Sequence, residues 1–143
     1  MTQYYNNKIG AYSVPILFYK PDDIRLRGLS STIVQHTDIM PSVLDYLGYN
    51  KEFICYGNSL FDNTHTHFSV NFNNSVYQII EGNRVLFFDG DRITGLYRFN
   101  TDSFLLKNLI KKERADRQVE KLKAIIQSFG DRLVSNRLTK EGS

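Results

Sequence analysis

The stretch that decides the fold is FSVNFNNSVYQIIEGNRVLFFDGDRITGLYRF, residues 68–99. Phe68, Val70 and Phe72 alternate with polar residues, which is the period-two pattern of a strand with one buried face. Three further apolar runs follow, separated by short polar turns, at residues 76–80, 84–88 and 93–99. Four short strands joined by tight turns predict an antiparallel meander.

Downstream of the meander the hydrophobic period becomes that of a helix. One face carries the apolar residues Val119, Leu122, Ile125, Ile126, Phe129 and Leu133. Charged residues occupy the other positions, so the segment predicts a long amphipathic helix that Gly130 weakens or bends. Such a helix is expected to cover one face of the sheet or to dock on something larger.

Upstream of the meander, YSVPILFYKP at residues 12–21 is a short apolar run that ends in proline. We expect a strand at about residues 15–19, buried on both faces. Pro15 lacks an N–H and is expected at the first position of that strand or at a bulge. Residues 22–31 are polar, which predicts a surface loop.

A short helix is predicted at about residues 39–47. Asp38 is expected to cap it, Pro41 suits its first turn, and Gly48 suits the left-handed position that ends it. Its apolar face is formed by Met40, Val43, Leu44 and Leu47. This spacing is typical of one amphipathic helix.

Composition indicates one ordinary globular domain of 143 residues, with 41% hydrophobic and 23% charged residues. No apolar run approaches the roughly 20 residues of a membrane span. The single cysteine, Cys55, excludes an internal disulfide and a cysteine-based metal site. A net charge of +3 is best explained by a solvated helix face. Any export signal is expected outside these residues.

Three stretches resemble the C-terminal region of sulfatases, and especially of bacterial lipoteichoic acid synthase-like phosphoglycerol transferases in the alkaline phosphatase superfamily. They are VPILFYKP at residues 14–21, VQHTDIMPSVLDYLG at residues 34–48 with the following segment 53–61, and GLYRFNTD at residues 95–102 with Asn108 and Leu109. Arg98 stands where the family usually has aspartate, and Ser103 where it has proline.

The resemblance implies that this chain is the C-terminal piece of a larger metal-dependent enzyme that acts on sulfate or phosphate esters. The nucleophile and the metal ligands, which hold Mn, Mg or Ca in the family, would lie in the N-terminal catalytic part of that protein. The implied fold is α/β, or α+β in isolation. Residues 1–62 would supply one strand and one helix of the main sheet, and residues 63–143 a four-stranded antiparallel sheet with a long C-terminal helix.

The resemblance assigns no catalytic residue and no metal ligand to this chain, which is therefore expected to be inactive alone and to hold no cofactor. Tyr4, Tyr5, Asn6 and Lys8 would follow directly after the family's last Asp-His metal-binding pair. They are the candidates for contact with the substrate in the parent enzyme. Whether that substrate is a sulfate ester or a phosphoglycerol group stays open, because the nucleophile is absent.

Histidine and cysteine residues elsewhere offer weaker sites. Cys55 is not the sulfatase nucleophile, since the proline and arginine of C/S-x-P-x-R do not follow it. His65 and His67 form His-x-His, but no third zinc ligand is marked by spacing, so a polar loop is favoured. His36 precedes the predicted helix and is interpreted as a packing or turn residue.

The sequence Asp89-Gly-Asp91 is similar to part of a calcium loop. An EF-hand requires a further acidic residue six positions after the glycine, and that position here is Leu96. A hairpin turn is therefore the prediction.

Two readings from other classes stay open beside the enzyme segment. The first is a stand-alone protein interaction module, favoured by 13% aromatic residues and by exposed strand edges. The second is a weak nucleic-acid binder, suggested by the basic balance and by aromatic residues on the strands. The family resemblance argues against both. The expected partners are the catalytic part of the same protein and, in isolation, a second copy of the chain. The parent would reside in the bacterial cell envelope, with membrane contact only through its other parts.

Overall fold

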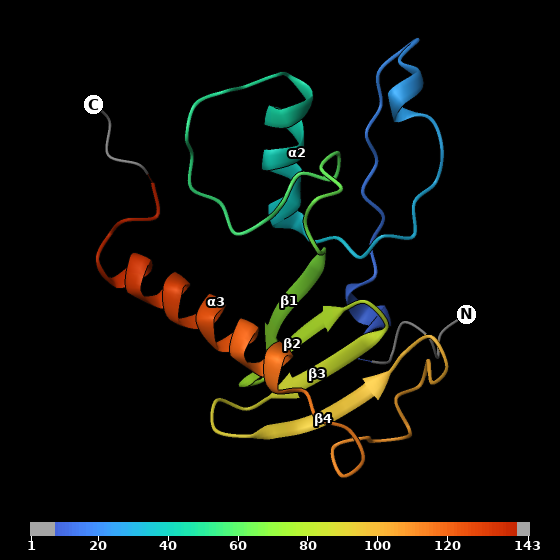
Figure 1. Cartoon of the computed structure of the whole chain (residues 1–143), viewed down its shortest axis with the longest axis vertical. Helices are drawn as coiled ribbons and strands as arrows, with labels where there is room; N and C mark the ends of the chain where they lie inside the picture. Colours follow the sequence, from blue (N-terminus) through green and yellow to red (C-terminus); the bar gives the residue numbers. More distant parts are fainter. Residues whose placement is uncertain (1–7, 140–143) are drawn as a thin grey trace.

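The computed structural model describes residues 8–139 and contains, in that range, one four-stranded antiparallel sheet (Figure 1). Its strands are β1 (Phe68–Asn73), β2 (Val76–Glu81), β3 (Arg84–Phe88) and β4 (Ile93–Arg98). They lie side by side in sequence order, each antiparallel to the next. The predicted meander is confirmed.

The turns of the meander set its register. Asn74 and Ser75, which join β1 to β2, both have positive φ, at 49° and 61°. That conformation makes a two-residue hairpin whose twist matches the strands, and it is one that asparagine tolerates well. Across the next two strand pairs Ile79 pairs with Leu86, and Leu86 pairs with Leu96, so one face of the sheet is apolar from strand to strand.

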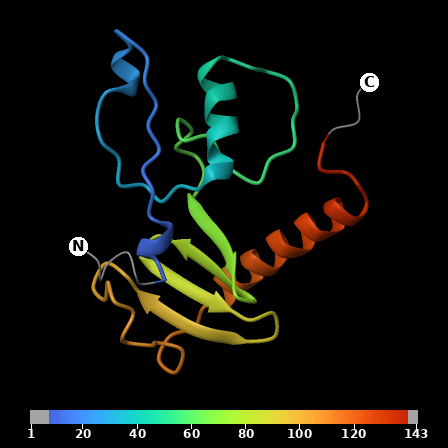
Figure 2. The same ribbon diagram turned by 180° about the vertical axis from the view of Figure 1, so that it is seen from behind.

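The first half of the C-terminal helix α3 (Asp116–Val134) covers that face. Leu122 is fully buried against the sheet, with Val119 and Ile126 packed beside it. The second half runs past the edge of the sheet (Figures 1 and 2), and its apolar residue Phe129 is exposed. The predicted helix is confirmed, and it continues through Gly130 without ending there.

The N-terminal segment covers the opposite face of the sheet. Ile9 packs with Ile80, Val85 and Phe87 in a second apolar cluster. The short 3-10 helix η1 (Gly10–Tyr12) follows on that side, away from α3 (Figure 2). Both faces of the meander are therefore buried by other parts of the chain, as a mixed α/β fold requires.

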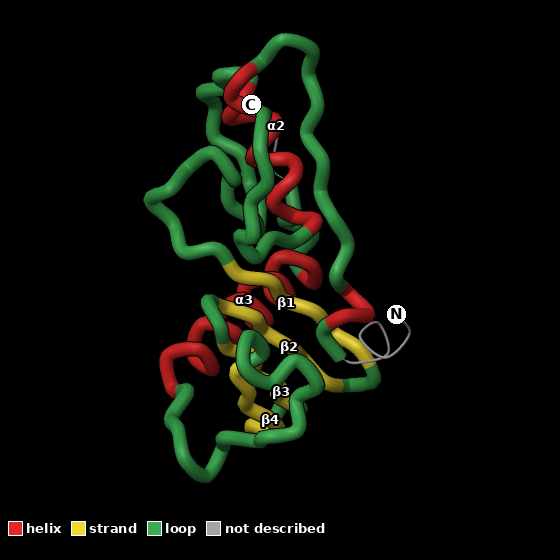
Figure 3. Tube along the Cα trace, turned by 90° about the vertical axis from the view of Figure 1, so that its right-hand side faces the viewer, coloured by secondary structure: helices red, strands yellow, loops and turns green. Residues whose placement is uncertain are grey.

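The remaining residues form a loop-rich region around helix α2 (Ile39–Tyr46), at the other end of the long axis (Figure 3). Two 3-10 helices, η2 (Ile24–Leu26) and η3 (His36–Asp38), belong to it. Helix α2 confirms the predicted short helix. Gly48 has φ 70°, the left-handed conformation expected after its end.

Two local predictions for this region are wrong. Asp38 does not cap α2: it has helical dihedral angles at the end of η3, and its side chain makes no cap bond to α2. The predicted strand at residues 15–19 is not formed either, because residues 13–20 have no strand partner and no regular secondary structure. A strand is stabilised by its neighbours, and the four strands of the meander do not pair with this segment.

None of the helices within residues 8–139 combines the length and the apolar content that crossing a membrane requires.

Candidate functional site

Of the four residues predicted to approach the substrate, Lys8 is the one that the structure describes. Tyr4, Tyr5 and Asn6 lie outside the described residues. Lys8 is exposed, and its ammonium group lies 5.1 Å from the centroid of the Phe87 ring, within the range of a cation–π interaction. Its backbone carbonyl accepts a hydrogen bond of 2.8 Å from the amide of Gln78.

Lys8 lies at the rim of an open cleft of about 300 Å³ on the sheet face opposite α3. The cleft is lined by Lys8, Ala11, Tyr12, Asn71, Asn73, Asn74, Val76, Gln78 and Phe87. Among these described residues none carries a carboxylate, so the ammonium is the one formal charge at the lining. The cleft therefore offers hydrogen bonds and a positive charge, which suit binding of an anion.

Amide side chains in the cleft are held by their neighbours. The Nδ2 of Asn71 donates to the Oε1 of Gln78 at 3.0 Å, and the Nδ2 of Asn73 donates to the hydroxyl of Tyr12 at 2.6 Å. The sequence reasoning missed these residues. The predicted meander does indicate them, because Asn71 and Asn73 are two apart on β1 and so share a face, and Asn71 pairs with Gln78 on β2.

A second cavity of about 340 Å³ adjoins the first and shares Ala11, Tyr12 and Asn71 with it. His36 and Gln35 belong to its lining. Gln35 also donates to the carbonyl of Tyr56 and accepts the N–H of Val70, the latter at 3.1 Å. It thereby satisfies one backbone donor at the free edge of β1, where an unpaired strand would otherwise recruit another chain.

The two most characteristic motif segments, 34–48 and 53–61, meet in one buried hydrogen-bonded unit. The carboxylate of Asp38 accepts the N–H of Gln35 and the N–H of Asn58, each at 2.9 Å. Ser42 donates to the carbonyl of Asp38 at 2.6 Å and accepts the N–H of Leu60 at 2.9 Å. Asp38 and Ser42 are almost fully buried, so this unit is architectural rather than open to a substrate.

Gly57 is required where those segments cross. A Cβ atom at this position would lie 2.2 Å from the carbonyl oxygen of Thr37, closer than real Cβ contacts allow. Next to it, Cys55 is half-buried, and its thiol donates to the carbonyl of Gly57 at 3.1 Å. The structure thus gives Cys55 a local packing and hydrogen-bonding environment.

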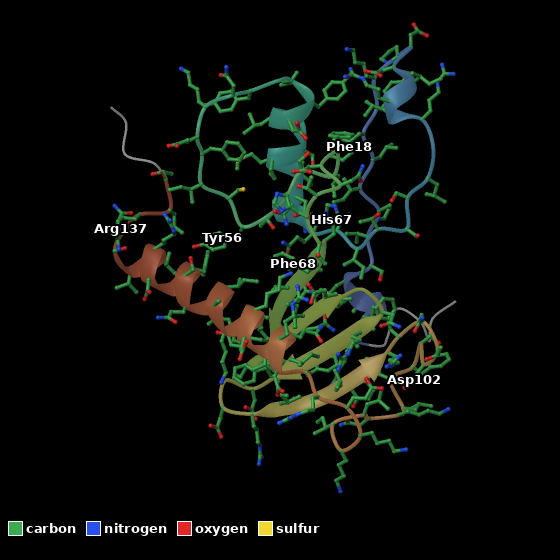
Figure 4. The ribbon with its side chains drawn as sticks, in the orientation of Figure 1. Phe18, Tyr56, His67, Phe68, Asp102 and Arg137 are labelled. Atoms are coloured by element: carbon green, nitrogen blue, oxygen red, sulfur yellow. The ribbon has the colours of Figure 1, made fainter. Side chains whose placement is uncertain are left out.

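His65 and His67 lie in the loop before β1, and Figure 4 places His67 at the junction between the α2 region and the sheet. The Nε2 of His65 is 3.4 Å from the carboxylate of Asp62. Hydrogen bonds from the backbone and side chain of Thr64 lower the pKa of Asp62, and the nearby histidines add to this. Within residues 8–139, no group of three or more His, Cys, Asp or Glu side chains is placed to hold a metal ion.

Asp89 forms the turn between β3 and β4. Its Oδ1 accepts the N–H groups of Asp91 and Arg92, at 3.0 and 2.9 Å. These two bonds lower the pKa of the carboxyl group. A tight hairpin turn, as predicted, accounts for the Asp-Gly-Asp sequence.

The α2 region differs from the sheet in where its apolar side chains lie. In the described chain the buried apolar side chains are Ile9, Pro41 and a set between residues 79 and 122. Exposed ones are frequent between residues 12 and 61, namely Tyr12, Val14, Leu17, Tyr19, Ile24, Leu29, Ile39, Met40, Val43, Leu47, Tyr49, Phe53 and Phe61. We call this set the apolar surface. Exposed apolar side chains in this number are typical of a region that contacts a partner.

Comparison with known proteins gives no relative for this chain: no family model, no curated protein and no solved structure matches it.

Proposed function

We propose that this chain is the C-terminal segment of a metal-dependent sulfatase or phosphoglycerol transferase that acts on sulfate or phosphate esters. The observation that carries the proposal is the apolar surface, because most of its residues lie in the segments 14–21, 34–48 and 53–61, whose motifs resemble that family. Leu17, at 87% exposure, belongs to the segment that resembles a strand of the family's main sheet. In this account the apolar surface docks on the N-terminal catalytic part of the same protein.

The buried unit around Asp38 supports the same account. The carboxylate of Asp38 and the hydroxyl of Ser42 are already hydrogen-bonded within the unit, so in this account both residues are structural and not catalytic. A region held together by polar contacts, with its apolar groups facing outward, is suited to closing the core of a larger domain. The segment's own task is then structural.

The divalent ion of the family does not fit the described residues of this chain, which present no ligand group for it. Its ligands and the nucleophile would belong to the catalytic part, which the account places in the bacterial cell envelope. Lys8 and its amide-lined cleft would then contribute positive charge near a sulfate or phosphate group. This is a binding role, since the described residues that line the cleft include no nucleophile paired with a base.

A second function from another class rests on the same apolar surface. The chain would be a stand-alone interaction module, with a second copy or a separate protein as its partner. Aromatic side chains are common on this surface, and they are enriched at protein interfaces. The two functions differ in the partner and in whether the partner is encoded by the same gene.

Sequencing the genomic DNA that flanks the coding region separates them. The enzyme account expects an in-frame upstream region with an Asp-His pair and either a threonine nucleophile or C/S-x-P-x-R. The joined protein should then turn over an aryl sulfate or a phosphodiester when Mn or Mg is added. An upstream stop codon without such a region, together with a stable homodimer in solution, would favour the interaction module.

A further inference from the structure

The loop that connects β4 to α3 presents lysines and exposed apolar side chains together. Residues 103–112 read SFLLKNLIKK, and we call them the lysine loop. Phe104 is 51% exposed, Leu106 81% and Ile110 37%, and Lys107, Lys111 and Lys112 are exposed between and after them. The loop lies at the end of the molecule opposite α2 (Figure 1).

The exposed side chains are held in place by the rest of the loop. Leu105 packs against one face of the sheet and Leu109 against the other, so both anchor the loop inward. Leu105 has φ 55°, an unusual conformation for leucine, which turns the next residue, Leu106, outward. Rigid anchoring of this kind means that the exposure of Leu106 is part of the fold.

Hydrogen bonds fix the same arrangement. The carboxylate of Asp102, labelled in Figure 4, accepts the N–H of Leu106 at 3.0 Å and that of Lys107 at 2.7 Å. The Oδ1 of Asn108 accepts the N–H of Ile110 at 3.1 Å, and the N–H of Leu109 donates to Leu96 at 2.8 Å. Hydrogen bonds therefore attach the loop to β4 and fix its conformation.

Charge at the loop is positive in sum, although Lys107 interacts electrostatically with Asp102. The one acid between residues 102 and 112 is Asp102, whose oxygens are occupied by the loop backbone. The next acid, Glu113, is paired with Arg98 at 3.1 Å and with Arg84 at 3.7 Å. Three lysines against one aspartate leave the loop with a net positive charge that can attract an external anion.

We propose that the lysine loop binds the surface of an anionic lipid membrane, with Leu106 as the inserted residue and the lysines on the headgroups. A membrane surface is the partner that takes up apolar side chains and basic residues at once. The phosphates of a nucleic acid would bind the lysines but would give the aliphatic side chains of Leu106 and Ile110 no apolar environment. This inference is independent of the proposed enzymatic function.

Co-sedimentation with vesicles tests it. The chain should bind vesicles made of equal parts of phosphatidylglycerol and phosphatidylcholine, should bind phosphatidylcholine vesicles far less, and should dissociate as salt is raised. Leu106→Ser should weaken binding roughly tenfold, because an inserted leucine is lost. Lys107→Gln/Lys111→Gln should weaken it on the order of thirtyfold, since each lysine near an anionic surface contributes about fivefold.

Matched controls keep the result specific. Val134→Ser removes a side chain that is 88% exposed at the end of α3, and Arg27→Gln/Lys51→Gln removes the same charge from the α2 region. Both should bind like the wild type. Absence of wild-type binding, or equal loss in the controls, overturns the proposal. Binding to an oligonucleotide that depends on the lysines but not on Leu106 would also overturn it, in favour of a nucleic-acid partner.

Discussion

The carboxylate of Asp38 reaches across twenty residues of sequence to accept the backbone N–H of Asn58 at 2.9 Å. With its second oxygen it accepts the N–H of Gln35, so one buried side chain joins the η3 segment to the segment around Asn58. The region has few buried apolar groups, and its shape therefore depends on such polar contacts.

Asp38→Asn tests this dependence directly. The amide replaces one acceptor oxygen with an NH₂ group that faces a backbone donor, so we expect a loss of about 2 kcal/mol in the free energy of unfolding. Urea denaturation of both proteins measures the difference. Asp22→Asn is the matched control, because Asp22 is exposed with φ 62°, which asparagine adopts readily. An equal effect in both variants would show that the buried contacts contribute nothing.

Gly57→Ala should be more damaging than its small size suggests. The added Cβ meets the carbonyl of Thr37 at 2.2 Å, so backbone has to move, and we expect a destabilisation of about 2–3 kcal/mol. Gly130→Ala is the comparison, since nothing lies within 4 Å of its Cβ and alanine favours the helix. Thermal unfolding should show the two substitutions shifting stability in opposite directions. A neutral Gly57→Ala would contradict the close crossing.

Acid should weaken the lysine loop through Asp102. Hydrogen bonds from the N–H groups of Lys107 and Leu106 lower the pKa of this carboxyl below 3.8. Because the folded-state pKa is depressed, the stabilisation is present above pH 3.8 and is lost as pH falls through the lower, folded-state value. The wild type should therefore be more stable than Asp102→Asn at neutral pH, and the gap should close in strong acid. A gap that does not change with pH would contradict the assignment.

Exposed apolar residues at 14–19 should make the isolated chain associate. Leu17→Ser removes one of the most exposed of them and should shift the chain toward monomer in light scattering at high protein concentration. Val134→Ser, which is equally exposed at the end of α3, should leave the oligomeric state unchanged. If the wild type is already a monomer, the apolar surface does not drive association.

The sequence predicts best where the determinants are local. The meander follows from alternation and from turn residues such as Asn74, and α2 follows from helical spacing closed by Gly48. Contacts between segments that are distant in sequence could not be predicted. Asp38 accepts a hydrogen bond from Asn58, whereas its local sequence predicts that it caps α2. The missing strand at residues 15–19 has a similar cause, since pairing needs a neighbouring strand and none of the strands within residues 8–139 pairs with this segment.

Hydrogen exchange at residues 14–19 tests the central claim most directly. It should be measured on the isolated chain and on the longer protein that contains the upstream coding region. We predict fast exchange at residues 14–19 in the isolated chain, because they have no strand partner there, and strong protection in the longer protein. Protection of residues 14–19 in a monomeric isolated chain, unchanged in the longer protein, would contradict the claim that this segment completes a larger enzyme.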